Sequence, residues 1–101
     1  MPLVTRDYDA ARYLDSDEAL DAYIADATER GDAQELAHAL GVVARAKGMT
    51  DLSRQTGLPR QTLYKALSGE GNPELATIAK VADALGYRLS LVAKSPADTA
   101  A

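Results

Sequence analysis

The residues from 50 to 67, TDLSRQTGLPRQTLYKAL, constrain the fold of this chain more than any other stretch. They form two short helical patterns with Gly57 between them. Glycine tolerates the positive φ of a tight turn, and Ser53 is small enough to let two helices cross closely. Pro59 suits the start of the second helix because its missing N–H has no intrahelical partner there. The stretch therefore predicts a helix-turn-helix unit.

The second helix of this unit, expected from about 59 to 68, buries Leu63, Ala66 and Leu67 and turns a polar face outward. Such a helix can enter the major groove of DNA, where its first residues reach base edges. Arginine and lysine hold phosphates or guanine, glutamine pairs with adenine, and threonine contacts a base edge or a thymine methyl group. For any single residue the alternative is an ordinary solvated face. The predicted DNA-binding residues are Arg54, Gln55, Arg60, Gln61, Thr62, Tyr64 and Lys65.

The distribution of charge bears on this prediction, because the formal net charge of −4 is unfavourable for a DNA-binding protein. Residues 1–41 hold 10 acidic and 3 basic side chains, whereas residues 42–71 hold 2 acidic and 5 basic ones. The basic excess thus coincides with the predicted reading helix, where phosphate contact requires it. Since the excess is small, we expect weak nonspecific affinity that falls steeply with salt.

Composition excludes several other classes of protein. A chain of 101 residues with 47% hydrophobic side chains suits one small folded domain, and dimerisation would help it. There is no cysteine, so disulfides and cysteine metal sites are excluded. The start, MPLVTRDYDA, has no signal-peptide pattern, and no apolar run is long enough to span a bilayer. We expect a cytoplasmic protein.

The capping and stop signals along the chain predict five or six helices. Side chains that accept hydrogen bonds from backbone N–H groups open helices, and glycines end them. The expected openings are Asp9, Asp15 with Glu18, Asp32 with Glu35, Thr50, Pro59 and Asn72-Pro73. The expected stops include Gly31, Gly48, Gly57 and Gly86. The last helix is expected to bury Leu75, Ile78, Ala79, Ala82 and Leu85.

The stretch YRLSLV after Gly86 carries the one clear strand signal, because apolar side chains alternate along it. A lone strand cannot satisfy its own backbone, so it needs a partner. We expect the same strand of a second chain, related by a two-fold axis, with Tyr87, Leu89 and Leu91 at the dimer contact. The alternative is an extended tail that packs Leu89 and Leu91 on the helices.

The predicted fold is therefore all-α with a short C-terminal β-strand. The expected organisation has an acidic helical extension at 1–31, the helix-turn-helix domain at 32–86, the dimerisation strand at 87–94 and a disordered tail at 95–101.

Four stretches together resemble a known family over nearly the whole chain, from Asp7 to Leu91. They are YDAARYLDS, GDAQELAHALGVVARAKGM, TGLPRQTLYKALSGEGNPEL and IAKVADALGYRLSL. The chain resembles the addiction-module antidote proteins, a HigA-like subgroup of the lambda-repressor-like, XRE-type helix-turn-helix proteins. The resemblance implies a homodimeric antitoxin that neutralises a small RelE/ParE-like toxin and represses its own operon at an inverted repeat of double-stranded DNA.

Two positions depart from the usual pattern of that family. Thr50 and Asp51 stand where a glutamine commonly touches phosphate, and Pro59 replaces the Ser or Thr that usually caps the reading helix. Both changes remove a phosphate contact, so we expect weaker DNA binding than in typical members.

The acidic N-terminal region is interpreted as a toxin-binding surface, because RNA-cleaving toxins of the class that the resemblance implies tend to be basic. An acidic helical surface could dock such a toxin and shield its active site. A solvated helix face is the alternative for each residue. The main candidates are Asp15, Asp17, Glu18 and Asp21, with Asp26 and Glu29 further along the helix.

No catalytic constellation accompanies these binding surfaces. His38 is the single histidine, and the sequence has no phosphate-binding glycine loop. We expect no metal, no cofactor and no enzymatic activity. Two further hypotheses stay open: a stand-alone regulator without a toxin, and an interaction module that has lost DNA binding.

Overall fold

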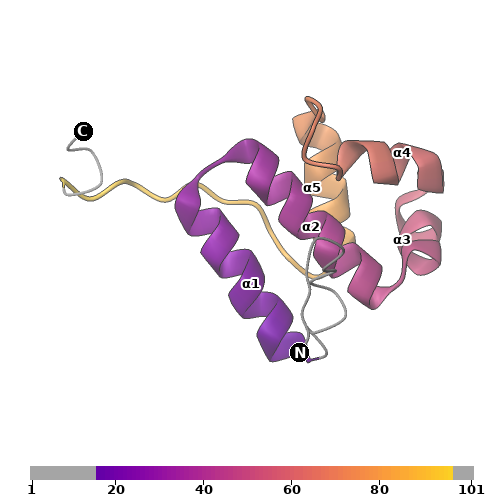
Figure 1. Cartoon of the computed structure of the whole chain (residues 1–101), viewed down its shortest axis with the longest axis horizontal. Helices are drawn as coiled ribbons and strands as arrows, with labels where there is room; N and C mark the ends of the chain where they lie inside the picture. Colours follow the sequence, from indigo (N-terminus) through magenta and orange to yellow (C-terminus); the bar gives the residue numbers. More distant parts are fainter. Residues whose placement is uncertain (1–15, 97–101) are drawn as a thin grey trace, which may run out of the picture.

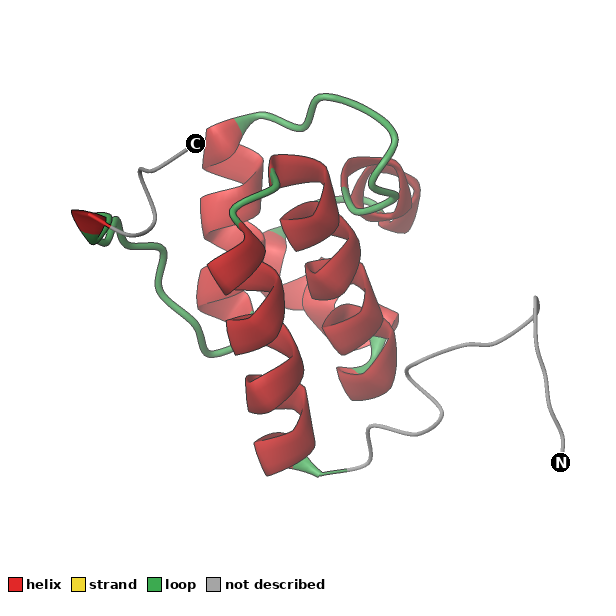
Figure 2. Ribbon diagram, turned by 60° about the vertical axis from the view of Figure 1, so that its left-hand side comes forward, coloured by secondary structure: helices red, strands yellow, loops and turns green. Residues whose placement is uncertain are grey.

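The computed structural model describes residues 16–96, which form five α-helices (Figures 1 and 2). The predicted short helix after Asp9 lies outside these residues. The helices are α1 (Asp17–Arg30), α2 (Ala33–Lys47), α3 (Met49–Thr56), α4 (Arg60–Ala66) and α5 (Leu75–Ala84). None of the helices in this part of the chain is long and apolar enough to cross a membrane.

Helices α1 and α2 form a hairpin whose ends follow local sequence signals. The α1 helix is capped by Ser16, whose Oγ accepts from the backbone N of Ala19 at 3.1 Å, one residue later than the predicted Asp15. Gly31 ends α1 in the left-handed region with φ of 71°. Asp32 then caps α2, as predicted, by accepting from the backbone N atoms of Gln34 and Glu35. The left-handed C-cap Gly31 and the N-cap Asp32 are adjacent in the chain, and together they set a sharp reversal between α1 and α2.

Helix α2 runs through the centre of the core. Every residue from 39 to 44 is buried, so this helix has no solvent-facing side over that stretch. The reason is that α1, α3 and α5 all pack against α2, while the end of α4 approaches it at Gly41. A Cβ on Gly41 would lie 2.7 Å from the carbonyl oxygen of Leu67. Gly41 therefore permits a close approach between elements.

Two predicted helix openings are wrong. Thr50 lies inside α3, whose N-cap is Gly48 without a side-chain hydrogen bond. Asn72 and Pro73 lie in the loop before α5, whose N-cap is Glu74. In both places the chain enters the helix from a tight connection, and tertiary packing rather than a capping side chain sets the first residue.

The buried stripe of α5 also differs from the prediction. Ile78, Ala82 and Leu85 are buried as expected, but Leu75 and Ala79 are exposed. Val81, which was not among the predicted core residues, is fully buried. The helix is apolar on more than one side, so two overlapping stripes satisfy helical spacing. Contact with α2 and α3 selects the stripe at 78, 81, 82 and 85.

The predicted C-terminal strand is wrong, since no residue from 16 to 96 is in a strand. Tyr87 instead closes the end of α5, where its backbone N donates to the carbonyl oxygen of Ala82 at 2.8 Å. The stretch 88–95, here called the C-terminal arm, has no regular secondary structure. It passes the start of α2 and then runs away from the helices (Figure 1). The described part of the chain contains no second extended segment with which the arm could pair.

Candidate nucleic-acid interface

The turn between α3 and α4 is held by two hydroxyl groups whose role the sequence did not reveal. Gly57 adopts φ of 76°, as predicted, and its N donates to the carbonyl oxygen of Ser53. The Ser53 Oγ donates to the carbonyl oxygen of Leu58 at 2.6 Å. The buried Thr56 Oγ1 donates to the carbonyl oxygen of Leu52 and accepts from the N of Leu58 at 3.2 Å. These bonds fix the direction in which the chain leaves α3 and enters α4.

Helix α4 is anchored to the core by its apolar side. Leu63 is completely buried and Leu67 is nearly so, while Ala66 is half-buried. The opposite side faces solvent, and Tyr64 keeps 46% of its surface exposed. The structure therefore brings the predicted reading residues of α4 together on one exposed face; they are Arg60, Gln61, Thr62, Tyr64 and Lys65.

Of the two predicted residues on α3, Gln55 lies toward the end of α5, where it lines a hollow with Lys47 and Leu85. Gln55 is exposed, and Arg54 forms an exposed ion pair with Asp51, with 3.0 Å between Nη1 and Oδ1. An exposed pair of this kind contributes little stability, so the guanidinium can exchange Asp51 for a phosphate at small cost.

Arg45 on α2 is a basic residue near this face that was not predicted as a DNA-binding residue. It lines a hollow of about 240 Å³ together with Tyr64 of α4 and Met49 of α3. The only sequence signal for Arg45 was the basic excess of residues 42–71, which does not show on which surface each basic side chain lies.

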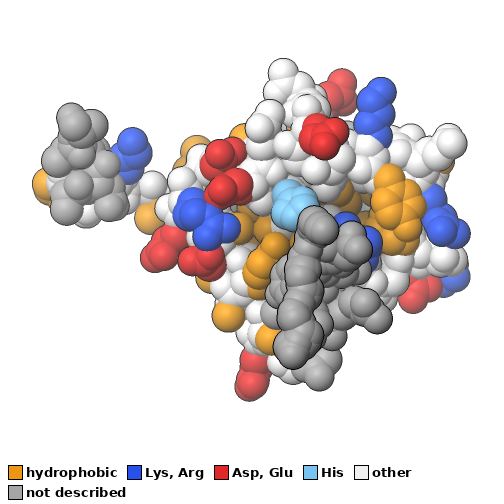
Figure 3. Space-filling view, viewed as in Figure 1, with side chains coloured by type: hydrophobic (Ala, Val, Ile, Leu, Met, Phe, Trp, Pro, Cys, Tyr) orange, Lys and Arg blue, Asp and Glu red, His pale blue; other side chains and the backbone are white. Residues whose placement is uncertain are grey.

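Lys47, two residues later, lies at the end of α5, where it lines a hollow with Asp51 and Gln55 of α3. Its Nζ donates to the carbonyl oxygen of Leu85 at 3.3 Å and lies 5.9 Å from the centre of the Tyr87 ring. Of the five basic residues at 42–71, Lys47 is thus the one whose side chain is bonded to the end of α5. Figure 3 shows blue side chains at the end of the molecule formed by α3 and α4.

The acidic candidates lie on and around α1. Asp15 lies outside the described residues, whereas Asp17 and Glu18 form the exposed first turn of α1, where negative charge suits the helix dipole. Asp21 is exposed and its Oδ1 accepts from the Tyr87 hydroxyl at 2.8 Å. Burial, followed by this bond to Asp21, raises the pKa of Tyr87.

Farther along α1, Arg30 organises two other carboxylates. Its Nε donates to Glu35 at 2.6 Å and its Nη1 pairs with Asp26. The bond to Glu35 and then that to Asp26 raise the pKa of Arg30. Figure 3 shows the resulting red and blue cluster where α1 meets α2. Asp26 is therefore engaged within the chain, while Glu29 is exposed beside it.

The predicted dimer residues fall on two different surfaces. Tyr87 is half-buried against the core and bonded to Asp21, which accounts for its side chain within one chain. Leu89 and Leu91 lie on the exposed arm. The structure therefore separates Tyr87 from the other two.

Residues 16–96 are thus all-helical, and α3, the turn at Gly57 and α4 with its outward polar face follow one another as helix, turn and helix. Residues 4–93 match the family described as "probable addiction module antidote protein", and the chain belongs to this family. That description implies a toxin as partner. An uncharacterized protein of Haemophilus influenzae is 38% identical over 86 residues, which cover 85% of this chain and 89% of that protein. No solved structure matches the chain.

Proposed function

We propose that this protein is an antitoxin without enzymatic activity that binds a RelE/ParE-like toxin and represses its own operon. The observation that carries the DNA-binding part is the exposed face of α4, set at a fixed angle by the Ser53 and Thr56 hydroxyl bonds. A rigid turn matters because base readout requires donors and acceptors to meet base edges in one geometry.

In this proposal each part of the face has a role. Arg60, Gln61 and Thr62 come first along α4 and read base edges in the major groove. Lys65, Arg54 and Arg45 contact phosphates on either side of the groove, which positions the helix without reading sequence. A homodimer would place two such helices in successive major grooves about 34 Å apart, so the operator is an inverted repeat.

The toxin-binding part rests on the charge of α1. Asp17, Glu18 and Glu29 are exposed on this helix, and Asp21 and Asp26 are held by Tyr87 and Arg30. A basic toxin would be attracted to this helix and would lose access to its RNA substrate when covered. Because α1 and α4 lie on different sides of α2, one chain can bind toxin and DNA through separate surfaces (Figure 1).

A gel shift with the DNA upstream of the gene tests the proposal. Wild-type protein should give a specific shift that weakens between about 50 and 200 mM salt. The double variant Arg60→Ala/Lys65→Ala should lose the shift. The matched control is Lys47→Ala/Lys80→Ala, which removes the same charge outside α3 and α4 and should keep the shift.

The other outcomes distinguish the remaining hypotheses. Absence of a wild-type shift at low salt would refute operator binding and favour an interaction module. A normal shift without any toxin that binds the protein would favour a stand-alone regulator. Equal loss in the double variant and its control would mean that net charge, not the α4 face, governs binding.

A further inference from the structure

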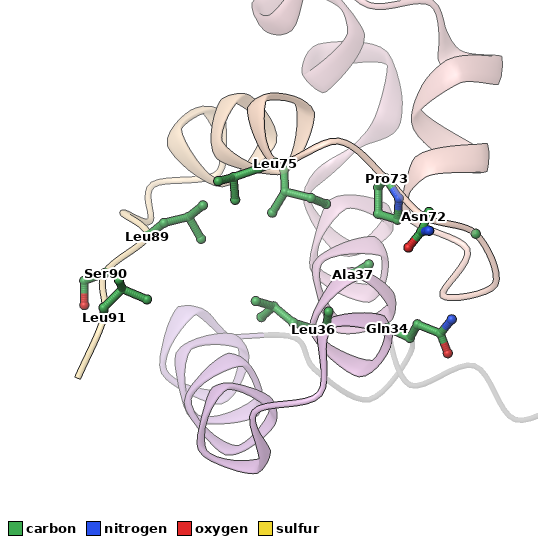
Figure 4. Close-up of a pocket in the computed structure, with 12 residues that line it drawn as sticks. Gln34, Leu36, Ala37, Asn72, Pro73, Leu75, Leu89, Ser90 and Leu91 are labelled. Atoms are coloured by element: carbon green, nitrogen blue, oxygen red, sulfur yellow. The ribbon is translucent and has the colours of Figure 1, made fainter. Parts of the chain in front are cut away.

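The described residues form an apolar groove of about 470 Å³. Its walls come from three places: the start of α2, the start of α5 with the loop before it, and the C-terminal arm. Figure 4 shows Leu36, Leu89 and Leu91 pointing toward the same open space, while Ser90 points away from it. Most of the lining is apolar, so the groove has the chemistry of a contact site for apolar side chains.

The apolar side chains around this groove are unusually exposed. Leu91 is fully exposed, Val92 is 84% exposed and Leu75 keeps 74% of its surface. Together with Leu89 they account for four of the five large exposed apolar side chains in the described residues. Concentration of exposed apolar surface at one place marks an interaction site.

The arm and the groove complement each other in shape and polarity. A cavity of about 150 Å³ holds a benzene-sized apolar group, so the groove has room for more than one such side chain. The arm presents Leu91 and Val92 in an extended segment that leaves the helices (Figure 1). The arm of one chain cannot fill its own groove, because it already forms one wall of it.

The charges of the arm and of the groove also match. The stretch from 87 to 96 contains two basic residues, Arg88 and Lys94, and no acidic residue. Two exposed acidic residues directly precede lining residues of the groove, Asp32 before Ala33 and Glu74 before Leu75. An arm from a second copy would therefore bring basic residues to an acidic rim, although the chain as a whole is acidic.

We propose that two copies of this chain exchange arms, with the outer part of each arm, at Val92, entering the apolar groove of the other while Leu91 stays in the wall of its own groove. The contact is reciprocal, as a two-fold axis requires. This inference rests on the homodimer of the proposed function and gives it an interface: arm into groove, not strand against strand. Tyr87 stays within its own chain, bonded to Asp21.

Sedimentation equilibrium without DNA tests the exchange. Wild-type protein should have twice the chain mass of 10.7 kDa at micromolar concentration. Both Val92→Asp on the arm, which does not line the groove, and Leu75→Asp on the groove should be monomers with unchanged circular dichroism, since both side chains are exposed. An equimolar mixture of the two variants should regain a dimer, because one intact arm then meets one intact groove. Ala79→Asp, exposed on α5 outside the groove, is the control and should remain a dimer.

Each contrary result overturns the exchange in a different way. A dimer that disappears only in the arm variant would mean that the arms pair with each other. A wild-type monomer that dimerises only when toxin is added would assign the groove to the toxin. A wild-type monomer that still shifts operator DNA would refute the exchange and leave DNA binding intact. A normal dimer that does not shift operator DNA would support the exchange and refute operator binding.

Discussion

At the scale of single residues, Gly41 has opposite effects on the isolated helix and on the folded domain. In the sequence it is a weak point in a helix, because glycine costs about 1 kcal/mol relative to alanine. In the structure it is the point where the end of α4 meets α2. The same residue therefore raises the free energy of the isolated helix and permits the packing of the folded domain.

Gly41→Ala should destabilise the protein although it improves helix propensity. The new Cβ would lie 2.7 Å from the Leu67 carbonyl oxygen and 3.2 Å from its Cβ, so backbone must shift. Overpacking of this kind costs about 1–3 kcal/mol, which exceeds the gain in propensity. Urea unfolding measures the difference. Gly71→Ala is the control, since no atom lies within 4 Å of its added Cβ. Equal stability of Gly41→Ala and wild type would contradict the close approach.

Tyr87 makes a prediction about pH. Its hydroxyl donates to Asp21, and the folded state raises its pKa above the ordinary value of 10.0. The folded protein thus binds this proton more tightly than the unfolded chain, so the stabilisation is complete below about pH 10 and is lost as pH rises further.

Tyr87→Phe should therefore unfold about 0.5–1.5 kcal/mol more easily at pH 7 and should lose this deficit above pH 10. The ring that lies beside Lys47 is retained in this variant, so the comparison isolates the hydroxyl group. Thermal unfolding of both proteins across pH 7–11 is the measurement. A deficit that stays constant across this range would show that the hydroxyl bond to Asp21 does not contribute.

At the scale of elements, each helix combines a buried side that it shares with its neighbours and an exposed side that differs in charge. Helix α1 buries Leu20, Ile24 and Ala27 in the same core as α2 and turns acidic side chains to solvent. Helix α4 buries Leu63 and turns basic and polar ones outward. The common core joins two surfaces of opposite charge at a fixed separation.

Removal of charge from α1 should weaken toxin binding and leave DNA binding unchanged. Asp17→Asn/Glu18→Gln should reduce the affinity for the toxin at least tenfold, with most of the change in the association rate because rim charges steer encounter. Glu70→Gln/Asp83→Asn, which removes the same charge elsewhere, is the control. Calorimetric titration with the toxin and a gel shift on the same samples provide both readouts. Unchanged toxin affinity would mean that the toxin binds to a surface other than the acidic side of α1.

At the scale of the whole molecule, the net charge of −4 conceals the segregation that binding to two oppositely charged partners requires. Acidic residues dominate α1 and its junction with α2, while four basic side chains lie on or beside α3 and α4. The local field at α4 therefore differs in sign from the molecule as a whole.

The salt dependence of DNA affinity reveals which basic residues touch phosphate. The slope of log K against log salt changes by about 0.9 for each phosphate that the protein no longer neutralises. Arg45→Ala should lower the slope by about one per protomer, whereas Lys47→Ala should leave it unchanged because its Nζ is bonded to Leu85. Binding at several salt concentrations provides the slopes. Equal slopes for Arg45→Ala and wild type would remove Arg45 from the interface.

Local signals in the sequence determined much of the fold. The cap at Asp32, the left-handed turns at Gly31 and Gly57, and the polar face of α4 are each set by residues close in the chain. Such features depend on backbone sterics and helical spacing, which neighbours decide.

Only the tertiary structure decided the features that depend on contacts between distant residues. The buried stripe of α5, the role of Gly41, the direction of Lys47 and the absence of a strand among the described residues follow from which elements meet. Apolar residues on two sides of a helix, or an alternating pattern at a chain end, permit more than one structure. Burial selects among them because the apolar surface removed from water depends on the neighbours that cover it.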